Sequence, residues 1–426
     1  MESKLIHPAN QIVDTISRIY KAGLTTTSGG NISIKDEEGN IWVTPSAVDK
    51  GSLTVKDIVC VKADGNIIGA HKPSSEFPFH KAIYDIRPDI KAIIHAHPPA
   101  LVSFSIVRQI PNTNIIPQAK KICGKIAYAK YALPGSKLLG EYIAEEFKKD
   151  IMAVIMENHG TVLGGTSLQD AYIRFEALEF SARTIIGAKT IGEPVYLSDK
   201  QIETFDSKMP DELPELKKIE HNSDELRIRE DIIKIVSRAY TQGLMISSYG
   251  TVSARWHDND FLITPRNVCR CNMQISDIVQ IKNGHKEPGK LPSRAVKLHK
   301  AIYEANPEIN SIILTQAPNI MAFGVSQEEF DVRTIPESWI FLQDVSIVPF
   351  GKQFEENFAK KFTNTSPALI IQNDSVIVTG DKLLQTFDRL EVAEFSAKSL
   401  IMAKPLGELV PINPEQIEDL RKNFLK

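Results

Sequence analysis

The sequence predicts a layered α/β domain that occurs twice in tandem. Two observations support this fold class. Four blocks of sequence recur in the same order, about 215 to 220 residues further along the chain. Within each copy, segments with the apolar spacing of helices are mixed with segments that have the apolar pattern of strands. Strands mixed with helices form sheets that helices cover, so each copy is expected to be one such domain.

The repeated blocks cover most of the chain. They begin at Ser17, Thr44, Pro73 and Met156 in the first copy, and at Ser237, Thr264, Pro292 and Ile371 in the second. Four collinear matches do not arise by chance, and the period is too long for a solenoid repeat. The charged segment between the copies contains two prolines and few apolar residues, which is typical of a linker. We therefore predict domains at residues 1–205 and 225–426, joined by a linker at 206–224.

The elements of the first copy follow from its apolar spacing. Ile12, Val13, Ile16 and Ile19 recur with the period of a helix, and the residues after the next Gly-rich turn alternate like a hairpin. Predicted in chain order are a helix at 9–22, a hairpin at 31–44 with its turn at 36–40, a helix at 76–86, strands at 90–95 and 151–157, and a long helix at 168–187.

Composition excludes several classes of protein. The 426 residues carry 50 basic and 53 acidic side chains, a net charge of −3, which offers no broad positive surface for nucleic acid or anionic lipid. No apolar run approaches the ~18 residues that span a bilayer, and the N-terminus lacks a secretory signal. The four cysteines are too few for a disulfide framework. A cytoplasmic protein without nucleic-acid or membrane partners is expected.

Three histidines of the first copy have the spacing of metal ligands. His95 and His97 follow an apolar strand, and residues two apart in a strand point to the same face. His159 follows a second apolar strand and completes a three-nitrogen site if the two strands end close together. Three protein ligands with one open position suit a catalytic divalent ion. Imidazole ligands favour Zn²⁺, with Mn²⁺, Co²⁺ or Fe²⁺ as alternatives.

A lone His-X-His is more often a packed or surface pair than a metal site, and the second copy helps to decide between the two. Its aligned positions hold Leu314, Gln316 and Asp374, while the flanking apolar residues persist. Histidines that merely packed would have little reason to be replaced all at once. The joint replacement therefore favours a metal site in the first copy.

A carboxylate disappears together with the histidines. Glu76 aligns with Ala295 of the second copy. A carboxylate beside a divalent ion can act as a general base or as a removable fourth ligand. The alternative is an ordinary acidic residue in the first turn of a helix. The joint loss favours the catalytic role for Glu76.

Polar turns of the first copy can bind an anion. The candidate residues for phosphate are Asn31, Ser46, Ala47, Ser74 and Ser75, which offer hydroxyls and backbone N–H groups in turns and before a helix. Each turn taken alone could equally be an ordinary turn or N-cap. In the second copy Asn31, Ser46 and Ser75 become Thr251, Arg266 and Arg294, and only Ser74 persists, as Ser293. This pattern again points to a site in the first copy.

These motifs together resemble the class II aldolase and adducin head-domain family. The resemblance rests on SGGNIS, TPSA, KPSSE followed by FH, HAHPP and ENHG, and it covers both copies. It implies a three-layer α/β/α domain with a largely antiparallel central sheet. It also implies Zn²⁺ on His95, His97 and His159, and an acid–base role for Glu76 that favours aldolases over epimerases, which carry Asp there. The phosphate-binding positions of the family match Asn31, Ser46, Ala47, Ser74 and Ser75, although aldolases usually have Gly where Ala47 stands.

The expected function is a zinc-dependent lyase that cleaves a ketose 1-phosphate to dihydroxyacetone phosphate and an aldehyde. The alternatives are a sugar-phosphate dehydratase, epimerase or decarboxylase of the same family, or a non-catalytic adducin-like binding protein. One departure bears on the substrate. Fuculose-phosphate aldolases use a tyrosine in the stretch that matches 115–118, where this chain has none; Tyr128 and Tyr131 are the candidate replacements. The family's four-fold rings imply a homo-oligomer in which two chains supply four domains.

Overall fold

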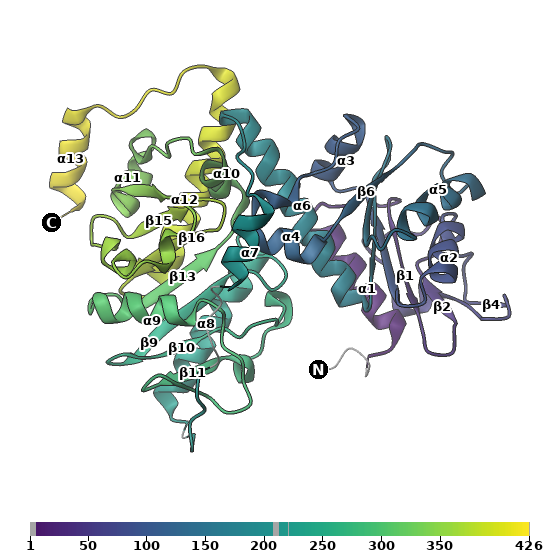
Figure 1. Ribbon diagram of the computed structural model, residues 1–426, viewed down its shortest axis with the longest axis horizontal. Helices are drawn as coiled ribbons and strands as arrows, with labels where there is room; N and C mark the ends of the chain where they lie inside the picture. Colours follow the sequence, from purple (N-terminus) through teal and green to yellow (C-terminus); the bar gives the residue numbers. More distant parts are fainter. Residues whose placement is uncertain (1–5, 208–212, 220, 426) are drawn as a thin grey trace. The chain divides into compact units, whose positions relative to one another are not determined.

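The computed structural model describes residues 6–207, 213–219 and 221–425. The chain divides into two compact units, Met1–Thr113 with Gln118–Ala182 and Asn114–Pro117 with Arg183–Lys426. Figure 1 colours the chain from purple at its start to yellow at its end. The predicted domain boundaries at 205 and 225 stay a prediction. Residues 208–212 and 220 of the predicted linker lie outside the described residues.

The first copy is built on an eight-stranded sheet with the order β4-β3-β2-β1-β5-β8-β7-β6. All neighbouring strands are antiparallel except β6 and β7, which are parallel. The strands are β1 (Asn31–Lys35), β2 (Ile41–Val43), β3 (Val59–Val61), β4 (Ile67–Ile68), β5 (Ala92–Ala96), β6 (Ile126–Ala129), β7 (Ala153–Met156) and β8 (Thr161–Gly165).

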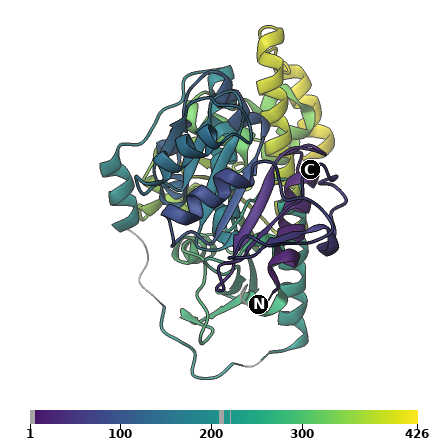
Figure 2. The same ribbon diagram turned by 90° about the vertical axis from the view of Figure 1, so that its right-hand side faces the viewer.

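Helices cover both faces of this sheet. They are α1 (Pro8–Lys21), α2 (Phe77–Ile86), α3 (Pro99–Ile106), α4 (Pro117–Cys123), α5 (Lys137–Phe147) and α6 (Leu168–Ile191). Figure 1 shows α2 and α5 together on one side of the sheet, where Ile83 and Ile143 share a buried core with Ile93 of β5 and Val154 of β7. In Figure 2 the purple helix α1 lies against the first strands, β1 and β2.

The second copy repeats the sheet strand for strand, in the order β12-β11-β10-β9-β13-β16-β15-β14. Only β14 and β15 are parallel. The strands are β9 (Thr251–His257), β10 (Asp260–Ile263), β11 (Val279–Lys282), β12 (His285–Lys286), β13 (Ser311–Thr315), β14 (Val345–Val348), β15 (Ala368–Ile371) and β16 (Ser375–Gly380). The register is also repeated: Asn31 pairs with His95 across β1 and β5, and Thr251 pairs with Leu314 across β9 and β13.

The helices of the second unit form two buried cores, one on each face of its sheet. They are α7 (Asp199–Ser207), α8 (Ser223–Thr241), α9 (Val296–Ala305), α10 (Pro318–Ser326), α11 (Pro336–Leu342), α12 (Leu383–Ala403) and α13 (Pro414–Phe424). The copies differ at one place. Where the first copy has α5, the second has two short 3₁₀ turns, Lys352–Phe354 and Phe358–Lys361, whose Phe358 fills the core against α9.

The predicted fold class is confirmed: each copy is a mostly antiparallel sheet between layers of helices. Each helix and strand predicted for the first copy is present, with ends that differ by a few residues. A disulfide joins Cys269 and Cys271, which the sequence analysis did not predict, while Cys60 and Cys123 are buried free thiols. Among the described residues, no helix has the length and apolar character that a membrane span requires.

Candidate active site

The candidate site lies at the end of β5, in the middle of the first sheet. His95 is the fourth residue of β5, and His97 follows the strand. β8 pairs with β5, and the turn that leads into β8 from β7 carries His159. The two predicted strands are therefore separated by β8. The hairpin turn between β7 and β8 brings His159 back beside the end of β5. The third imidazole therefore lies close to the other two, as a three-nitrogen site requires.

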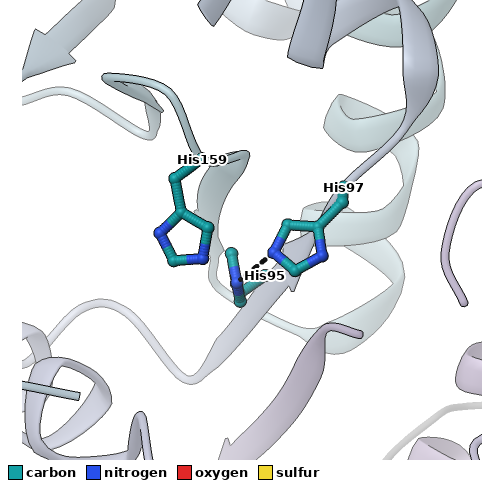
Figure 3. Close-up of side chains that lie close together, drawn as sticks. All are labelled: His95, His97 and His159. Atoms are coloured by element: carbon teal, nitrogen blue, oxygen red, sulfur yellow. Dashed lines mark hydrogen bonds between the residues drawn. The ribbon is translucent and has the colours of Figure 1, made fainter. Parts of the chain in front are cut away.

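The structure brings the three predicted histidines together. Figure 3 shows their rings pointing toward one another. One nitrogen from each lies within 4.8 Å of the others, and the Nε2 atoms of His95 and His97 are 3.0 Å apart. Nitrogens bound tetrahedrally at about 2.0–2.1 Å from a zinc ion stand just over 3 Å apart. The spacing of the three rings therefore fits one shared divalent ion.

Two hydrogen-bonding details fit a metal as well. His95 Nδ1 lies 2.9 Å from the Thr161 carbonyl, which can only accept, so Nδ1 carries the proton and Nε2 presents a lone pair to the cluster. The second detail is Glu76, which is 8% exposed. Its Oε1 accepts no hydrogen bond from the described residues and lies 3.5 Å from His159 Nε2. A buried carboxylate whose oxygens face His95 and His159 suits a cation between these groups.

The electrostatics leave two of the three rings, His97 and His159, neutral and therefore free to bind a cation. Burial and the neighbouring His95 lower the pKa of His97 to about 3 and that of His159 to about 4, so both rings are neutral near pH 7. Burial opposes ionisation of Glu76, but His95, His159 and Asn31 outweigh it and hold the pKa of Glu76 well below its usual range. Burial likewise lowers the pKa of His95, and the Glu76 carboxylate more than compensates and raises it.

Glycines leave room for the His97 ring. A Cβ at Gly160 would lie 2.5 Å from His97 Cδ2, and a Cβ at Gly29 would lie 2.9 Å from His97 Nδ1. Neither distance is possible for a real side chain unless the ring moves. The comparison of the two copies noted the loss of the histidines but not that these glycines change with them. Gly29 aligns with Tyr249 of the second copy, and Gly160 aligns with Ser375. This joint change could have identified the two glycines as part of the site.

Ser105 supports His159 and was also missed. Its Oγ donates to the Met156 carbonyl at 2.8 Å and accepts from the His159 backbone N–H at 3.0 Å. The hydroxyl therefore fixes the turn that presents the His159 ring. Its aligned residue is Gly324, so its loss in the second copy was visible in the sequence.

The predicted phosphate residues lie next to one another, but their hydrogen bonds differ from the expectation. Pro45 and Pro73 form an antiparallel backbone bridge that joins the two turns, with Ser46 opposite Lys72 and Ser74 opposite Thr44. The Ser46 N–H donates to the Lys72 carbonyl and the Ser74 N–H donates to the Thr44 carbonyl. The expectation that these two amides are open to a ligand was wrong, because the bridge uses them. The exposed Ser75 and Ala47 and the half-buried Ser46 line the outside of these turns.

A buried cation stands behind these turns. Lys50 is 3% exposed, and its ammonium donates to the carbonyls of Pro45 and Val48 at 2.9 and 3.0 Å. Its backbone N–H donates to the Thr27 carbonyl beside the Gly-rich turn. Burial lowers the pKa of Lys50. The sequence analysis did not select Lys50, because one lysine in a turn carries no signal by itself.

Asn31 lies inside the site rather than on its rim. Its Nδ2 donates to Glu76 Oε2 at 2.7 Å, and its Oδ1 lies 2.5 Å from Nε2 of the fully buried His80. The tyrosines named as candidate replacements both approach the turn that carries His159. Tyr128 OH donates to the Ser105 carbonyl at 3.4 Å, and the Tyr131 N–H donates to Glu157 Oε2 at 3.0 Å. Only Tyr131 has a largely exposed side chain.

The family relationship follows from both copies. The model of the class II aldolase and adducin N-terminal domain matches residues 10–186 and again residues 230–401. The chain belongs to the class II aldolase and adducin family. The resemblance stated from the motifs is thereby confirmed, and so is the tandem duplication of a class II aldolase domain.

Curated members of the family that resemble this chain catalyse different reactions. The L-fuculose phosphate aldolase of Methanococcus maripaludis is 37% identical over 38% of this chain and 86% of its own length. The 5-deoxy-D-ribulose 1-phosphate aldolase of Bacillus thuringiensis is 33% identical over 46% of this chain and 93% of its own. The 3-oxo-tetronate 4-phosphate decarboxylase of Haemophilus influenzae is 30% identical over 44% and 91%. Each match has about the length of one copy.

Proposed function

We propose that the first copy is a metal-dependent aldolase that cleaves a ketose 1-phosphate to dihydroxyacetone phosphate and an aldehyde, with zinc as its metal. The observation that carries the proposal is the cluster of three imidazoles with a buried carboxylate, Glu76, beside it. A divalent ion held by His95, His97 and His159 supplies Lewis acidity that polarises a carbonyl oxygen and stabilises developing negative charge.

Glu76 is placed to move a proton in this reaction. Cleavage of the C3–C4 bond takes a proton from the C4 hydroxyl and returns one to C3. The Glu76 carboxylate lies 3.1 Å from His95 Nε2, within hydrogen-bond reach of anything bound to the cluster. Asn31 fixes one carboxylate oxygen, Oε2, and leaves Oε1 facing the cluster for proton transfer.

The turns around Ser46 and Ser74 are proposed to hold the phosphate of the substrate. The hydroxyl of Ser75 and the backbone of Ala47 are exposed there. The buried ammonium of Lys50 adds a positive charge behind the turns, in a position that attracts an anion without contacting it. The absence of a tyrosine at 115–118 argues for a ketose phosphate other than fuculose phosphate.

Decarboxylation of a 3-oxo acid phosphate is the second candidate, and the similarity to 3-oxo-tetronate 4-phosphate decarboxylase favours it. In both reactions the carbon attached to a ketone carbonyl loses its bond to the next carbon. The negative charge is left on that α carbon in each case. The same metal cluster and proton donor serve both. The substrate decides between the candidates: one releases an aldehyde and the other releases carbon dioxide.

The deciding experiment combines metal analysis with a substrate panel. The purified protein is expected to hold about one zinc or similar ion per chain and to cleave at least one ketose 1-phosphate. His95→Ala is expected to lose both the ion and turnover, because it removes the central ligand. Release of carbon dioxide from an oxo-acid phosphate, with no aldehyde from any ketose, selects decarboxylation. A metal-free protein with full activity would contradict both candidates.

A further inference from the structure

We infer that His80 is a positioning residue, which sets the orientation of Glu76 through the side-chain amide of Asn31. This inference rests on the proposed function and gives a role to His80, the histidine of the FH pair that follows KPSSE in the sequence. Four buried side chains form an unbroken hydrogen-bonded chain that ends on the Glu76 carboxylate; from the far end they are Tyr84, Ser33, His80 and Asn31.

The direction of each hydrogen bond follows from the last one. A carboxylate only accepts, so the Asn31 amide nitrogen must face Glu76 Oε2, and its oxygen must face His80. An amide oxygen also only accepts, so His80 carries its proton on Nε2. Nδ1 of the same ring must then accept from the Ser33 hydroxyl at 2.7 Å. The Tyr84 hydroxyl lies 2.8 Å from Ser33 Oγ and also donates to the Ser33 carbonyl at 3.1 Å, so its proton is shared between the two oxygens.

This arrangement gives His80 one specific effect on the chemistry. The Asn31 amide is held at its nitrogen by the carboxylate, and without a donor at its oxygen it is free to rotate away from Glu76. The Nε2–H of His80 prevents this, since a donor there tolerates only the amide oxygen. Asn31 then donates to Glu76 Oε2, which also lies 3.1 Å from His95 Nε2. Oε1 accepts no hydrogen bond from the described residues and lies 3.5 Å from His159 Nε2. His80 itself lies outside that cluster and acts only through Asn31.

The second copy keeps the histidine, serine and tyrosine of this hydrogen-bonded chain but not the asparagine. His299 is fully buried, and its Nδ1 lies 2.7 Å from Ser253 Oγ, which lies 2.7 Å from the Tyr303 hydroxyl. Where Asn31 would stand, Thr251 hydrogen-bonds to Ser293 instead. His299 Nε2 has no hydrogen-bond partner among the residues that the structure describes. A histidine that served packing alone would not leave a buried nitrogen unpaired in one copy and pair it with a catalytic network in the other.

Matched substitutions in the two copies test the inference. His80→Leu removes the donor to Asn31, and His80→Gln keeps one, because the glutamine amide nitrogen occupies the place of Nε2. His299→Leu makes the same change in an equally buried site with the same serine and tyrosine partners. Loss of the residue that orients a catalytic group typically costs about 10–100-fold. We expect a fall of that size in kcat for His80→Leu with little change in KM, near-normal kcat for His80→Gln, and near-normal kcat for His299→Leu.

A second measurement needs neither turnover nor metal. In metal-free protein with ¹⁵N-labelled histidine, NMR reports which ring nitrogen carries the proton. The Nε2–H form of His80 is expected, assigned by its loss in His80→Gln. This measurement stands even if His80→Leu does not fold or if no ketose phosphate is cleaved, so failure of the proposed function is distinguishable from failure of this inference.

Three results would overturn the inference. The Nδ1–H form of His80 would leave Nε2 as an acceptor facing the Asn31 oxygen, so His80 could not hold the amide. Equal losses of kcat in His80→Leu and His299→Leu would show that both histidines act only on folding. A rise in KM without a fall in kcat would place the effect of His80 on substrate binding rather than on Glu76.

Discussion

The two copies share a fold and differ in the side chains at the candidate site. Both sheets have the same strand order, and the pairing of Asn31 with His95 recurs as that of Thr251 with Leu314. Even the turn before the third ligand is kept: Asn158 and Asn373 occupy the left-handed region with φ of 51° and 52°. The candidate metal-binding and acid–base residues are lost while the backbone persists. The fold of this domain therefore does not require the three histidines.

The residues that are replaced in the second copy are those that surround one candidate site in the first. The ligands are replaced, and so are the glycines that make room for the His97 ring and the serine that holds the His159 turn. Tyr249, in place of Gly29, is buried where the histidine would need space. Metal binding at such a site thus depends on the residues around the ligands as well as on the ligands themselves.

The largest change would be to give the second copy a metal site. Because the backbone is retained, five substitutions are expected to raise the metal content from about one to about two ions per chain. They are Tyr249→Gly, Leu314→His, Gln316→His, Asp374→His and Ser375→Gly. Metal analysis of the purified variant measures this directly. The three histidines without the two glycines are the control, and they should bind more weakly. A folded five-fold variant with a single ion would show that the copies differ more deeply than their side chains indicate.

The converse change should damage the first copy. Gly160→Ser introduces the residue of the second copy, and its Cβ would occupy space 2.5 Å from the present position of His97 Cδ2. The ring must move, so metal affinity should fall by about 10–100-fold while the fold is kept. Titration with a competing chelator measures the affinity. Ser375→Gly serves as the control and should leave it unchanged. Equal affinities for Gly160→Ser and the unaltered protein would mean that His97 is not a ligand.

Acid should destabilise both copies through the buried neutral histidine that they share, and the first copy further through His97 and His159. Burial lowers the pKa of His80 and of His299 to about 3. The unfolded chain takes up these protons near pH 6.5, so the stability is present above that pH and is lost as the pH falls toward 3. Each histidine can contribute a slope of up to about 1.4 kcal/mol per pH unit. Urea unfolding between pH 7 and pH 4.5 measures the slope, and His299→Gln should make it shallower. An unchanged slope in that variant would contradict the buried neutral state of His299.

The smallest expected effect concerns one turn. Ala47 has a φ of 57°, and its counterpart Asn267 has a φ of 61°. Asparagine tolerates this left-handed region better than alanine, so Ala47→Asn should stabilise the protein by about 0.5–1 kcal/mol. Asn267→Ala should destabilise it by a similar amount. Thermal denaturation of the two variants checks both signs. A destabilising Ala47→Asn would show that the side chain at this position meets a contact that the backbone argument leaves out.

Much of this structure was visible in the sequence, for physical reasons that also explain the gaps. Apolar spacing predicted the helices and strands, and alternation along a strand placed His95 and His97 together. The phosphate role of Ser46 and Ser74 stays a prediction, and their amides are used by a bridge between Pro45 and Pro73 that no local pattern reveals. His80 was missed because it is retained in both copies, and a comparison that looks for joint loss cannot find a residue that stays.

The unpaired nitrogen of His299 also preserves a record of descent. A histidine whose Nε2 meets nothing in the described structure has the geometry of one selected to hold an amide. This geometry is expected if the domain that was duplicated possessed the asparagine and the second copy lost it afterwards. The serine and tyrosine neighbours still hold the histidine in the orientation that an asparagine partner would need. In the second copy the supporting residues are present without the residue that they would support.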